Sequence, residues 1–272
     1  PSNFLKRLQS VALGCLSCLL VLWLGSCSAL PPSPVVTLNF GAAGMVRSAL
    51  QEIDQLYQQD HSHVWLNTTF AGTGTIRAAV EQGEPFDGVL FADGKTLNQL
   101  QAKGLIVPES RRELVTTDIV VIARSESALE IRDLRDLASD RIKAVAMGNN
   151  NLAVGKYSHT ILERLGLAQV VESKAVWAKV DVREVLRAVE QGEADVGITF
   201  LPEAKTLTNV KVLATVSPDL YEPIRSGAAV LTTSTHAQEM QSYLDFLSSD
   251  RAMAIFQKFG LSPLRSQVSG IS

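Results

Sequence analysis

A five-residue string occurs twice in the chain, and each copy is followed by an apolar stretch. Val-Glu-Gln-Gly-Glu begins at Val80 and again at Val189, 109 residues later. The apolar stretches cover 88–91 and 197–200. This period is too long for a solenoid repeat, and each copy has the order helix, glycine turn, strand. Chance can produce so short a match, but its context favours two α/β lobes of similar build.

The first 26 residues predict an export signal. Lys6 and Arg7 precede an apolar run over 11–24, which is marginal for a membrane-spanning helix of about 20 residues. The ending Leu-Gly-Ser-Cys27 resembles a bacterial lipobox, in which cleavage precedes a lipidated cysteine. We therefore expect a lipoprotein-type signal peptide over 1–26, lipidation of Cys27 and a proline-rich tether over 27–34. A plain signal peptide or an uncleaved anchor is the alternative.

The composition argues against several classes of protein. All three cysteines lie at or before Cys27, so the body has no disulfide and no thiolate metal site. The net charge is −3 and no basic run stands out, which argues against nucleic acid as a partner. His61 and His63 favour a solvated loop over a zinc site. The sequence predicts no cation site, no cofactor and no catalytic residue, because nucleophile-elbow and phosphate-loop patterns are absent.

Apolar segments alternate with helical patterns along the body. Strands are expected over 35–40, 64–70 and 86–91, each followed by a helix, the third over 96–103. This order favours a parallel sheet.

A second unit starts with one long strand over 114–123. Further strands are expected over 142–147, 196–200 and 210–216, with helices through 157–165 and over 181–189. A late strand over 228–232 is expected to return to the first lobe, followed by helices over 237–247 and 250–259.

The chain therefore crosses twice between the lobes. We expect lobe 1 over 35–114 and 219–272, and lobe 2 over 115–218. Two crossings predict a hinged clamp.

Four helix starts carry small or backbone-exposing residues: Gly44, Thr73, Val154 and Val182. Three follow directly from a strand end, where open α/β sheets bind ligands. The first turn of a helix has unpaired N–H groups and the positive end of the dipole, so it suits an anion. Any single turn of this kind can also be a mere tight connection, but four of them predict an anion site between two lobes.

Charged residues lie close to these helix starts. Arg77, Lys156 and Arg183 could be counter-ions, although ion pairs at the surface or between the lobes are favoured. Asp181 and Glu184 indicate a helix cap, and Asp93 is expected to brace the end of a strand.

Several short motifs in this order and spacing resemble the molybdate-binding proteins of ABC importers. They are Phe-Gly-Ala-Ala-Gly-Met at 40–45, Phe-Ala-Gly-Thr-Gly-Thr at 70–75, Phe-Ala-Asp at 91–93, Ala-Val-Gly at 153–155, Asp-Val-Arg at 181–183, Gly-Ile-Thr-Phe at 197–200 and Ile-Phe-Gln-Lys-Phe-Gly at 255–260. The resemblance implies a type II periplasmic-binding fold, an α/β clamp with two lobes. It implies a tetrahedral oxyanion, molybdate or tungstate, as ligand. It also implies a permease with a cytoplasmic ATPase as partner, an extracytoplasmic location and a monomer.

Carried over by position, the ligand contacts fall on Gly44, Thr73, Val154, Val182 and Phe200. The first four would donate backbone N–H groups, and the Thr73 hydroxyl could add another donor.

Two positions depart from the resembled pattern. That pattern has Ser at the place of Gly44 and Tyr at the place of Phe200, so two hydroxyl donors are missing; Thr75 is a possible substitute. Two further hypotheses therefore stay open beside molybdate or tungstate binding. One is a pocket for another small anion or an organic acid, and the other is an exported enzyme.

Overall fold

The computed structural model describes residues 35–264, and the chain from Val35 forms one compact unit. The predicted signal peptide, Cys27 and the tether lie outside the described residues. Within 35–264, no helix is both long and apolar enough to cross a membrane.

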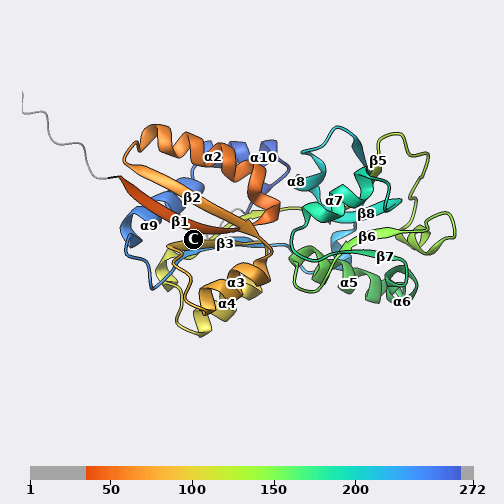
Figure 1. The fold of residues 1–272 in the computed structure, drawn as a ribbon, viewed down its shortest axis with the longest axis horizontal. Coiled ribbons are helices and arrows are strands. Elements are labelled where there is room, and N and C mark those ends of the chain that lie inside the picture. The colour runs from red at the N-terminus through yellow and green to blue at the C-terminus, as the bar shows by residue number, and fades with distance from the viewer. Residues whose placement is uncertain (1–34, 265–272) are drawn as a thin grey trace, which may run out of the picture. The chain divides into compact units, whose positions relative to one another are not determined.

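Two β-sheets organise this unit (Figure 1). We call the first sheet and its helices lobe 1, and the second sheet and its helices lobe 2. The first sheet has the order β11-β4-β10-β3-β1-β2, with strands β1 (Val36–Ala43), β2 (Val64–Ala71), β3 (Gly88–Phe91), β4 (Arg112–Thr116), β10 (Ser226–Val230) and β11 (Ser262–Pro263). The second has the order β7-β6-β8-β5-β9, with strands β5 (Ile119–Arg124), β6 (Val145–Gly148), β7 (Ala175–Ala178), β8 (Val196–Phe200) and β9 (Val210–Thr215).

The two sheets are built alike around the duplicated string. In lobe 1, β3 pairs in parallel with β1 and antiparallel with β10. In lobe 2, β8 pairs in parallel with β6 and antiparallel with β5. The glycine in each copy, Gly83 and Gly192, has a positive φ of 86° and 75°, which a side chain would strain. The prediction of two similar α/β lobes is confirmed.

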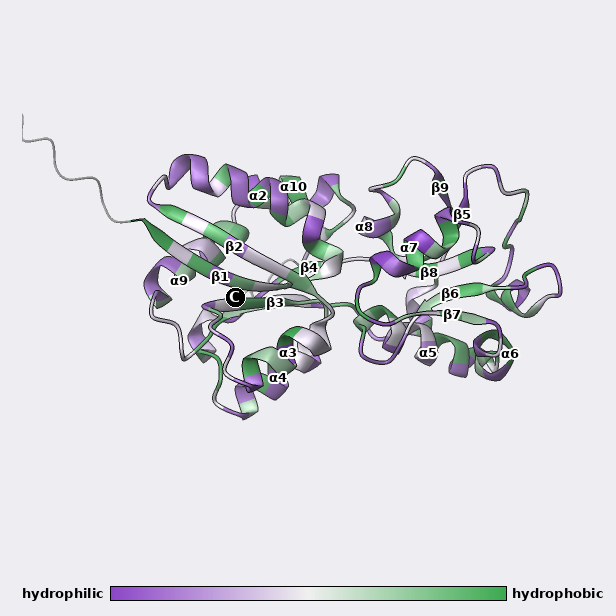
Figure 2. Ribbon diagram, in the orientation of Figure 1, coloured by the Kyte–Doolittle hydropathy of each residue, from purple (hydrophilic) through white to green (hydrophobic). Residues whose placement is uncertain are grey.

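Helices flank both sheets. Lobe 1 contains the 3-10 turns η1 (Gly44–Val46) and η2 (Pro108–Ser110) and the helices α2 (Arg47–Asp60), α3 (Thr73–Glu81), α4 (Gly94–Ala102), α9 (Ala237–Leu247) and α10 (Asp250–Lys258). Lobe 2 contains η3 (Leu134–Ala138), α5 (Ala153–Leu165), α6 (Ala168–Glu172), α7 (Arg183–Glu190) and α8 (Leu201–Ala204), and η4 (Pro218–Leu220) follows β9. Figure 2 shows the apolar strands between helices whose outward faces are polar. This is the amphipathic pattern expected of helices that cover a sheet.

The predicted strand over 114–123 is wrong as a single element. The chain leaves lobe 1 at Thr116, the end of β4, and enters lobe 2 at Ile119, the start of β5. Leu114 and Val115 of β4 and the stretch 119–123 of β5 are apolar and buried, so hydrophobicity alone does not reveal that the chain changes sheets between them. The return crossing runs from β9 to β10, and the Val216 N–H donates to the Ile119 carbonyl at 2.8 Å. The two crossings are therefore hydrogen-bonded to each other.

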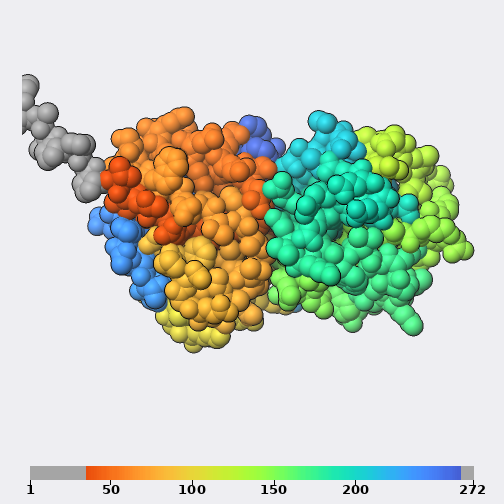
Figure 3. Space-filling view, viewed as in Figure 1, coloured from red at the N-terminus to blue at the C-terminus, as the bar shows by residue number. Residues whose placement is uncertain are grey.

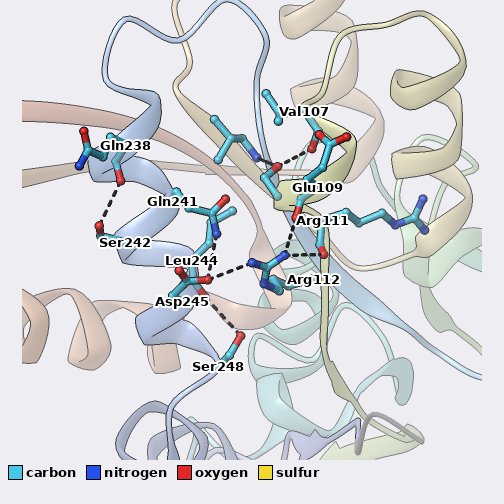
Figure 4. Close-up of polar contacts among 12 residues, drawn as sticks. Val107, Glu109, Arg111, Arg112, Gln238, Gln241, Ser242, Leu244, Asp245 and Ser248 are labelled. Carbon is cyan, nitrogen blue, oxygen red and sulfur yellow. Dashed lines mark hydrogen bonds and ion pairs between the residues drawn. The ribbon is translucent and has the colours of Figure 1, made fainter. Parts of the chain in front are cut away.

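Arg112, the first residue of β4, links β4 to η2 and α9 within lobe 1. Its guanidinium donates to the Glu109 carbonyl at 2.8 Å and pairs with Asp245 of α9 at 3.1 Å (Figure 4). The side chain of the preceding residue, Arg111, extends away from this cluster. Arg111 instead lines a cavity between the lobes.

Candidate functional site

A small pocket between the lobes brings together all five residues singled out from the sequence. Gly44, Thr73, Val154, Val182 and Phe200 all line it. Its volume is about 20 Å³, more than the roughly 10–15 Å³ that one water needs and far below the roughly 300–1,000 Å³ of pockets for drug-sized ligands. The pocket therefore suits an object of a few atoms.

Four of these residues present backbone N–H groups at helix starts. Thr73 is the first residue of α3 and Val154 the second residue of α5, while Gly44 opens η1 and Val182 directly precedes α7. Within residues 35–264, no protein acceptor is found for these four N–H groups. Unpaired N–H groups at the positive ends of helix dipoles attract an anion.

The Thr73 side chain adds a hydroxyl to the pocket. It is buried, and its Oγ1 accepts a long hydrogen bond of 3.4 Å from the Ala92 N–H. Its own proton therefore stays available for a ligand. Thr75, the possible substitute for a missing donor, is exposed and does not line the pocket.

The two positions without a hydroxyl have different surroundings. Phe200 is 2% exposed and meets the Tyr157 ring edge to face, with 6.1 Å between the ring centroids. At Gly44, an added Cβ would lie 3.0 Å from Asp181 Oδ1 and 3.3 Å from Val182 Cγ1. A side chain at position 44 would therefore press against lobe 2 in this arrangement of the lobes.

An ion pair between the lobes lies beside the pocket, and sequence reasoning missed it. Arg47, the first residue of α2, donates to Asp181 Oδ2 at 2.7 Å. Asp181 itself lines the pocket, and its Oδ1 accepts the Arg183 N–H at 3.1 Å. The Arg47 guanidinium also lies over the Phe70 ring at 4.6 Å. The sequence could have indicated this residue, because Arg47 is a cation that follows the predicted anion-binding residue Gly44 by about one helical turn.

A buried carboxyl group, Glu203 of α8, lies near this ion pair and was also missed. Its residue is 6% exposed, and burial raises its pKa to about 8. The negative charge of Asp181 raises this pKa further, while Arg47 and Arg183 act in the opposite direction. Because α8 also contacts η1 of lobe 1, the protonation of Glu203 bears on how the lobes meet.

The three cations considered as counter-ions do not line the pocket. Arg77 pairs with Glu81 at 3.6 Å, Lys156 lines a different cavity and Arg183 is exposed.

The carboxylates expected to cap a helix and to brace a strand end both bind backbone N–H groups. Glu184 accepts the Asp181 N–H at 3.2 Å, and Asp93 caps α4 by accepting the Thr96 N–H at 2.7 Å. Asp93 therefore holds the segment between β3 and α4.

The described residues 35–264 contain no group of three or more His, Cys, Asp or Glu side chains that could hold a metal ion. The His61 ring stacks on Tyr57, with 4.0 Å between the ring centroids.

Comparisons with known proteins agree with this geometry. The family model described as bacterial extracellular solute-binding protein matches residues 38–262. The molybdate-binding protein ModA of Haemophilus influenzae is 29% identical over 227 residues, which cover 82% of this chain and 88% of that protein. A protein from a Pseudomonas species named aconitate isomerase is 25% identical over 268 residues, covering 96% and 98%.

A solved structure shows the same fold. The periplasmic molybdate-binding protein of Azotobacter vinelandii superposes with a TM-score of 0.74 at 20% identity, covering 82% of this chain and 98% of that one. The two-lobed α/β arrangement is thus that of the type II periplasmic-binding proteins. The chain belongs to the bacterial extracellular solute-binding proteins, the family of the molybdate-binding components of ABC importers.

Proposed function

We propose that this protein captures a tetrahedral oxyanion, molybdate or tungstate, and delivers it to the permease of an ABC importer driven by a cytoplasmic ATPase. Gly44, Thr73, Val154 and Val182 donate backbone N–H groups, and Phe200 forms an apolar wall. The observation that carries the proposal is the convergence of four unpaired helix-start N–H groups, two from each lobe, on one small pocket.

The pocket attracts an anion although no cationic residue among residues 35–264 lines it. Each helix start stabilises a negative charge by about 0.3–1 kcal/mol at an exposed site and up to about 2 kcal/mol when partly buried. The carboxylate of Asp181 opposes this attraction. Its pairing with Arg47 offsets the opposition, so the ion pair is part of the binding site.

The pocket favours fully ionised oxyanions over protonated ones. The polar groups facing it are backbone N–H groups, the Thr73 hydroxyl and Asp181. Both oxygens of Asp181 already accept hydrogen bonds, from Arg47 and from the Arg183 N–H. Hydrogen phosphate brings a proton that needs an acceptor, so it would bind less well than molybdate or tungstate.

Binding is coupled to closure of the lobes. Because Gly44 and Thr73 belong to lobe 1, and Val154 and Val182 to lobe 2, an anion can satisfy all four donors only when the lobes are close. A ligand with this preference shifts the population toward the closed state. No bond is made or broken.

The proposal includes the export and anchoring of the chain. The signal peptide over 1–26, lipidation of Cys27 and the tether over 27–34 would hold a monomer outside the cytoplasm at the membrane surface. The two moving parts follow the expected lobe bounds, 35–114 with 219–272 and 115–218, except that the first boundary falls between Thr116, the end of β4, and Ile119, the start of β5.

Two alternatives have specific support. The missing hydroxyls at Gly44 and Phe200 favour a pocket fitted to another small anion or an organic acid. The relative named aconitate isomerase raises the possibility of an exported enzyme. Against catalysis, Asp181 is the one titratable residue among the described residues 35–264 that lines the pocket, and it is engaged with Arg47.

Titration calorimetry on a soluble chain that begins at Ser28 tests the proposal. The panel is molybdate, tungstate, sulfate, chromate and phosphate. We expect submicromolar binding of molybdate or tungstate, with phosphate silent. Silence across the panel would refute the oxyanion function and redirect the search to other anions, while turnover of cis- or trans-aconitate by the same sample would establish the enzyme.

A further inference from the structure

A second and larger cavity lies between the lobes. Its volume is about 480 Å³, within the range of pockets that hold organic ligands. It is lined from lobe 1 by the first half of α4 and the start of β4, from lobe 2 by α5, and by the crossing segment before β10. In Figure 1, α4 and α5 lie on the same side of the two sheets. We call this cavity the interlobe groove.

Two ion pairs in the groove neutralise the charges of four of its side chains. Lys95 pairs with Glu222 at 2.8 Å, and Arg225 pairs with Glu113 at 3.0 Å. These four side chains join α4, β4 and the crossing segment, and contribute little net charge.

Three other cations lack an ion-pair partner within residues 35–264. Arg111 donates to the side-chain amide oxygens of Asn98 and Gln101, and Arg164 donates to a backbone carbonyl. Lys156 has no polar side-chain contact in the described part of the chain. Lys156 and Arg164 are eight residues apart on α5, with Thr160 midway, so the three share one face of that helix.

The groove also contains a buried acceptor without a donor. Asp93 is 9% exposed and lines the groove. Its Oδ1 accepts from the Thr96 N–H at 2.7 Å and the Thr96 hydroxyl at 2.8 Å. Its Oδ2 is buried and has no hydrogen-bond partner among residues 35–264. A buried carboxylate oxygen without a donor is costly, and a ligand that brings a hydroxyl would satisfy it.

We propose that the interlobe groove is a second binding site, for a hydroxylated organic acid with at least two negative charges. Lys156 and Arg164 bind its anionic groups from lobe 2, and Arg111 binds them from lobe 1. Asp93 Oδ2 accepts a hydrogen bond from its hydroxyl. The site shares no polar residue with the oxyanion pocket, so both can be filled together, and it does not depend on the proposed oxyanion function.

Matched pairs of acids test this site by titration calorimetry on the purified protein. Citrate and malate carry the hydroxyl; tricarballylate and succinate are the same acids without it. We expect citrate and malate to bind, each about tenfold more tightly than its counterpart, because each supplies the donor that Asp93 lacks. Because the groove ligand is also held from both lobes, saturating molybdate should not weaken these affinities and should tighten them where it closes the lobes. Silence of all four acids, or competition by molybdate, would overturn the proposal.

Variants separate the two recognition elements. K156Q/R164Q should weaken citrate at least about tenfold through loss of charge-assisted hydrogen bonds. R132Q/R135Q removes the same charge from two exposed positions at η3 of lobe 2 that do not line the groove, and should leave citrate binding unchanged. If both double variants weakened citrate binding equally, the loss of affinity would come from the change in net charge alone, and the site would be refuted.

Asp93→Asn keeps the Oδ1 cap of α4 and replaces Oδ2 by a donor. The variant should show a smaller preference for citrate over tricarballylate, since the hydroxyl exchanges a charged acceptor for a neutral hydrogen-bond partner. Retention of the full citrate preference would contradict the role of Asp93, whereas circular dichroism of the variant reports whether α4 and the fold are intact.

Discussion

Arg47 and Asp181 join the two lobes across 2.7 Å, beside the pocket in which the helix starts converge. Each residue begins or precedes a helix, and each lies within a few residues of a proposed ligand contact, Gly44 or Val182. Their side chains are 21% and 20% exposed, so solvent screens the pair only in part. Figure 3 shows the surfaces of the two lobes in contact along this boundary. The pair therefore stabilises the closed arrangement and neutralises a carboxylate that would repel an anion.

Arg47→Gln should weaken molybdate binding about tenfold, or about 1.4 kcal/mol, because it removes a half-buried ion pair and leaves Asp181 facing the ligand. Asp181→Asn in the same chain should recover part of this loss. R251Q, which breaks the Arg251–Asp60 pair within lobe 1, is the matched control and should leave the Kd unchanged. Calorimetry on wild type, Arg47→Gln, Asp181→Asn alone and the double variant measures the coupling between the two side chains. A Kd for Arg47→Gln equal to that of wild type would show that the pair does not contribute to binding.

Glu203 predicts a pH dependence of stability. Burial raises its folded-state pKa to about 8, above the ordinary 4.5, so the folded state binds a proton that the unfolded chain has lost. Stability should therefore fall as pH rises from about 5 to 8. Asp54, whose pKa burial raises to about 6, acts in the same direction at lower pH. Thermal unfolding at several pH values should show that Glu203→Gln flattens the curve between pH 6 and 8; an unchanged slope would mean that this carboxyl group is ionised in the fold.

Phe200→Tyr should tighten molybdate binding by up to about tenfold, because it returns a hydroxyl donor to a buried wall of the pocket. Tyr157→Phe is the control, since Tyr157 lies in the interlobe groove and not in the pocket. Unchanged or weaker affinity of Phe200→Tyr by calorimetry would count against the placing of this ring at the ligand.

Thr73→Val keeps the shape of the side chain and removes its hydroxyl. We expect about a tenfold loss of molybdate affinity, as for a hydrogen bond to a charged group. The same change at the exposed Thr75 should have no effect. Equal affinities for the two variants would show that the ligand does not use the Thr73 hydroxyl.

Gly155→Ala should destabilise the fold by about 3 kcal/mol. An added Cβ would lie 2.0 Å from the Asn149 carbonyl oxygen and 2.4 Å from that of Gly148, both of them backbone atoms. Gly94→Ala, whose Cβ would have no neighbour closer than 3.8 Å, should change stability by less than about 1 kcal/mol. Urea unfolding of both variants measures this difference in stability. A wild-type urea midpoint for Gly155→Ala would show that the loop before α5 shifts to accommodate the added methyl group at little cost.

Local patterns predicted much of the fold. The helix expected over 237–247 has the bounds of α9, and the strand over 196–200 those of β8. The late strand returns to the first sheet as β10, which lies between β3 and β4. These segments have clear periodicity and clear turn residues at their ends.

The elements that were missed lack such signals. β7 is a short edge strand in which Trp177 is 41% exposed, and α8 has four residues that begin directly after β8. The first crossing escapes a hydrophobicity argument because Leu114 and Val115 of β4 and most of β5 are buried, and only Thr117 and Asp118 separate the two strands.

The five pocket residues were placed through a resemblance, and the structure brings them together. Arg47 and Asp181 were not paired from the sequence because 134 residues separate them. Glu203 is buried where α8 packs against strands of its own lobe and against η1 of lobe 1, contacts between segments far apart in the chain that no local pattern encodes. The charged environment of the pocket is therefore a product of the tertiary structure.

In the proposed complex, helix-start N–H groups of both lobes hold a tetrahedral oxyanion. A crystal structure with bound molybdate, in which molybdenum is located by anomalous scattering, is the direct test of this binding mode. We expect one molybdenum peak in the small pocket, with oxygens within hydrogen-bond distance of the N–H groups of Gly44, Thr73, Val154 and Val182. A peak in the interlobe groove instead, or an ion held by Arg or Lys side chains, would contradict it.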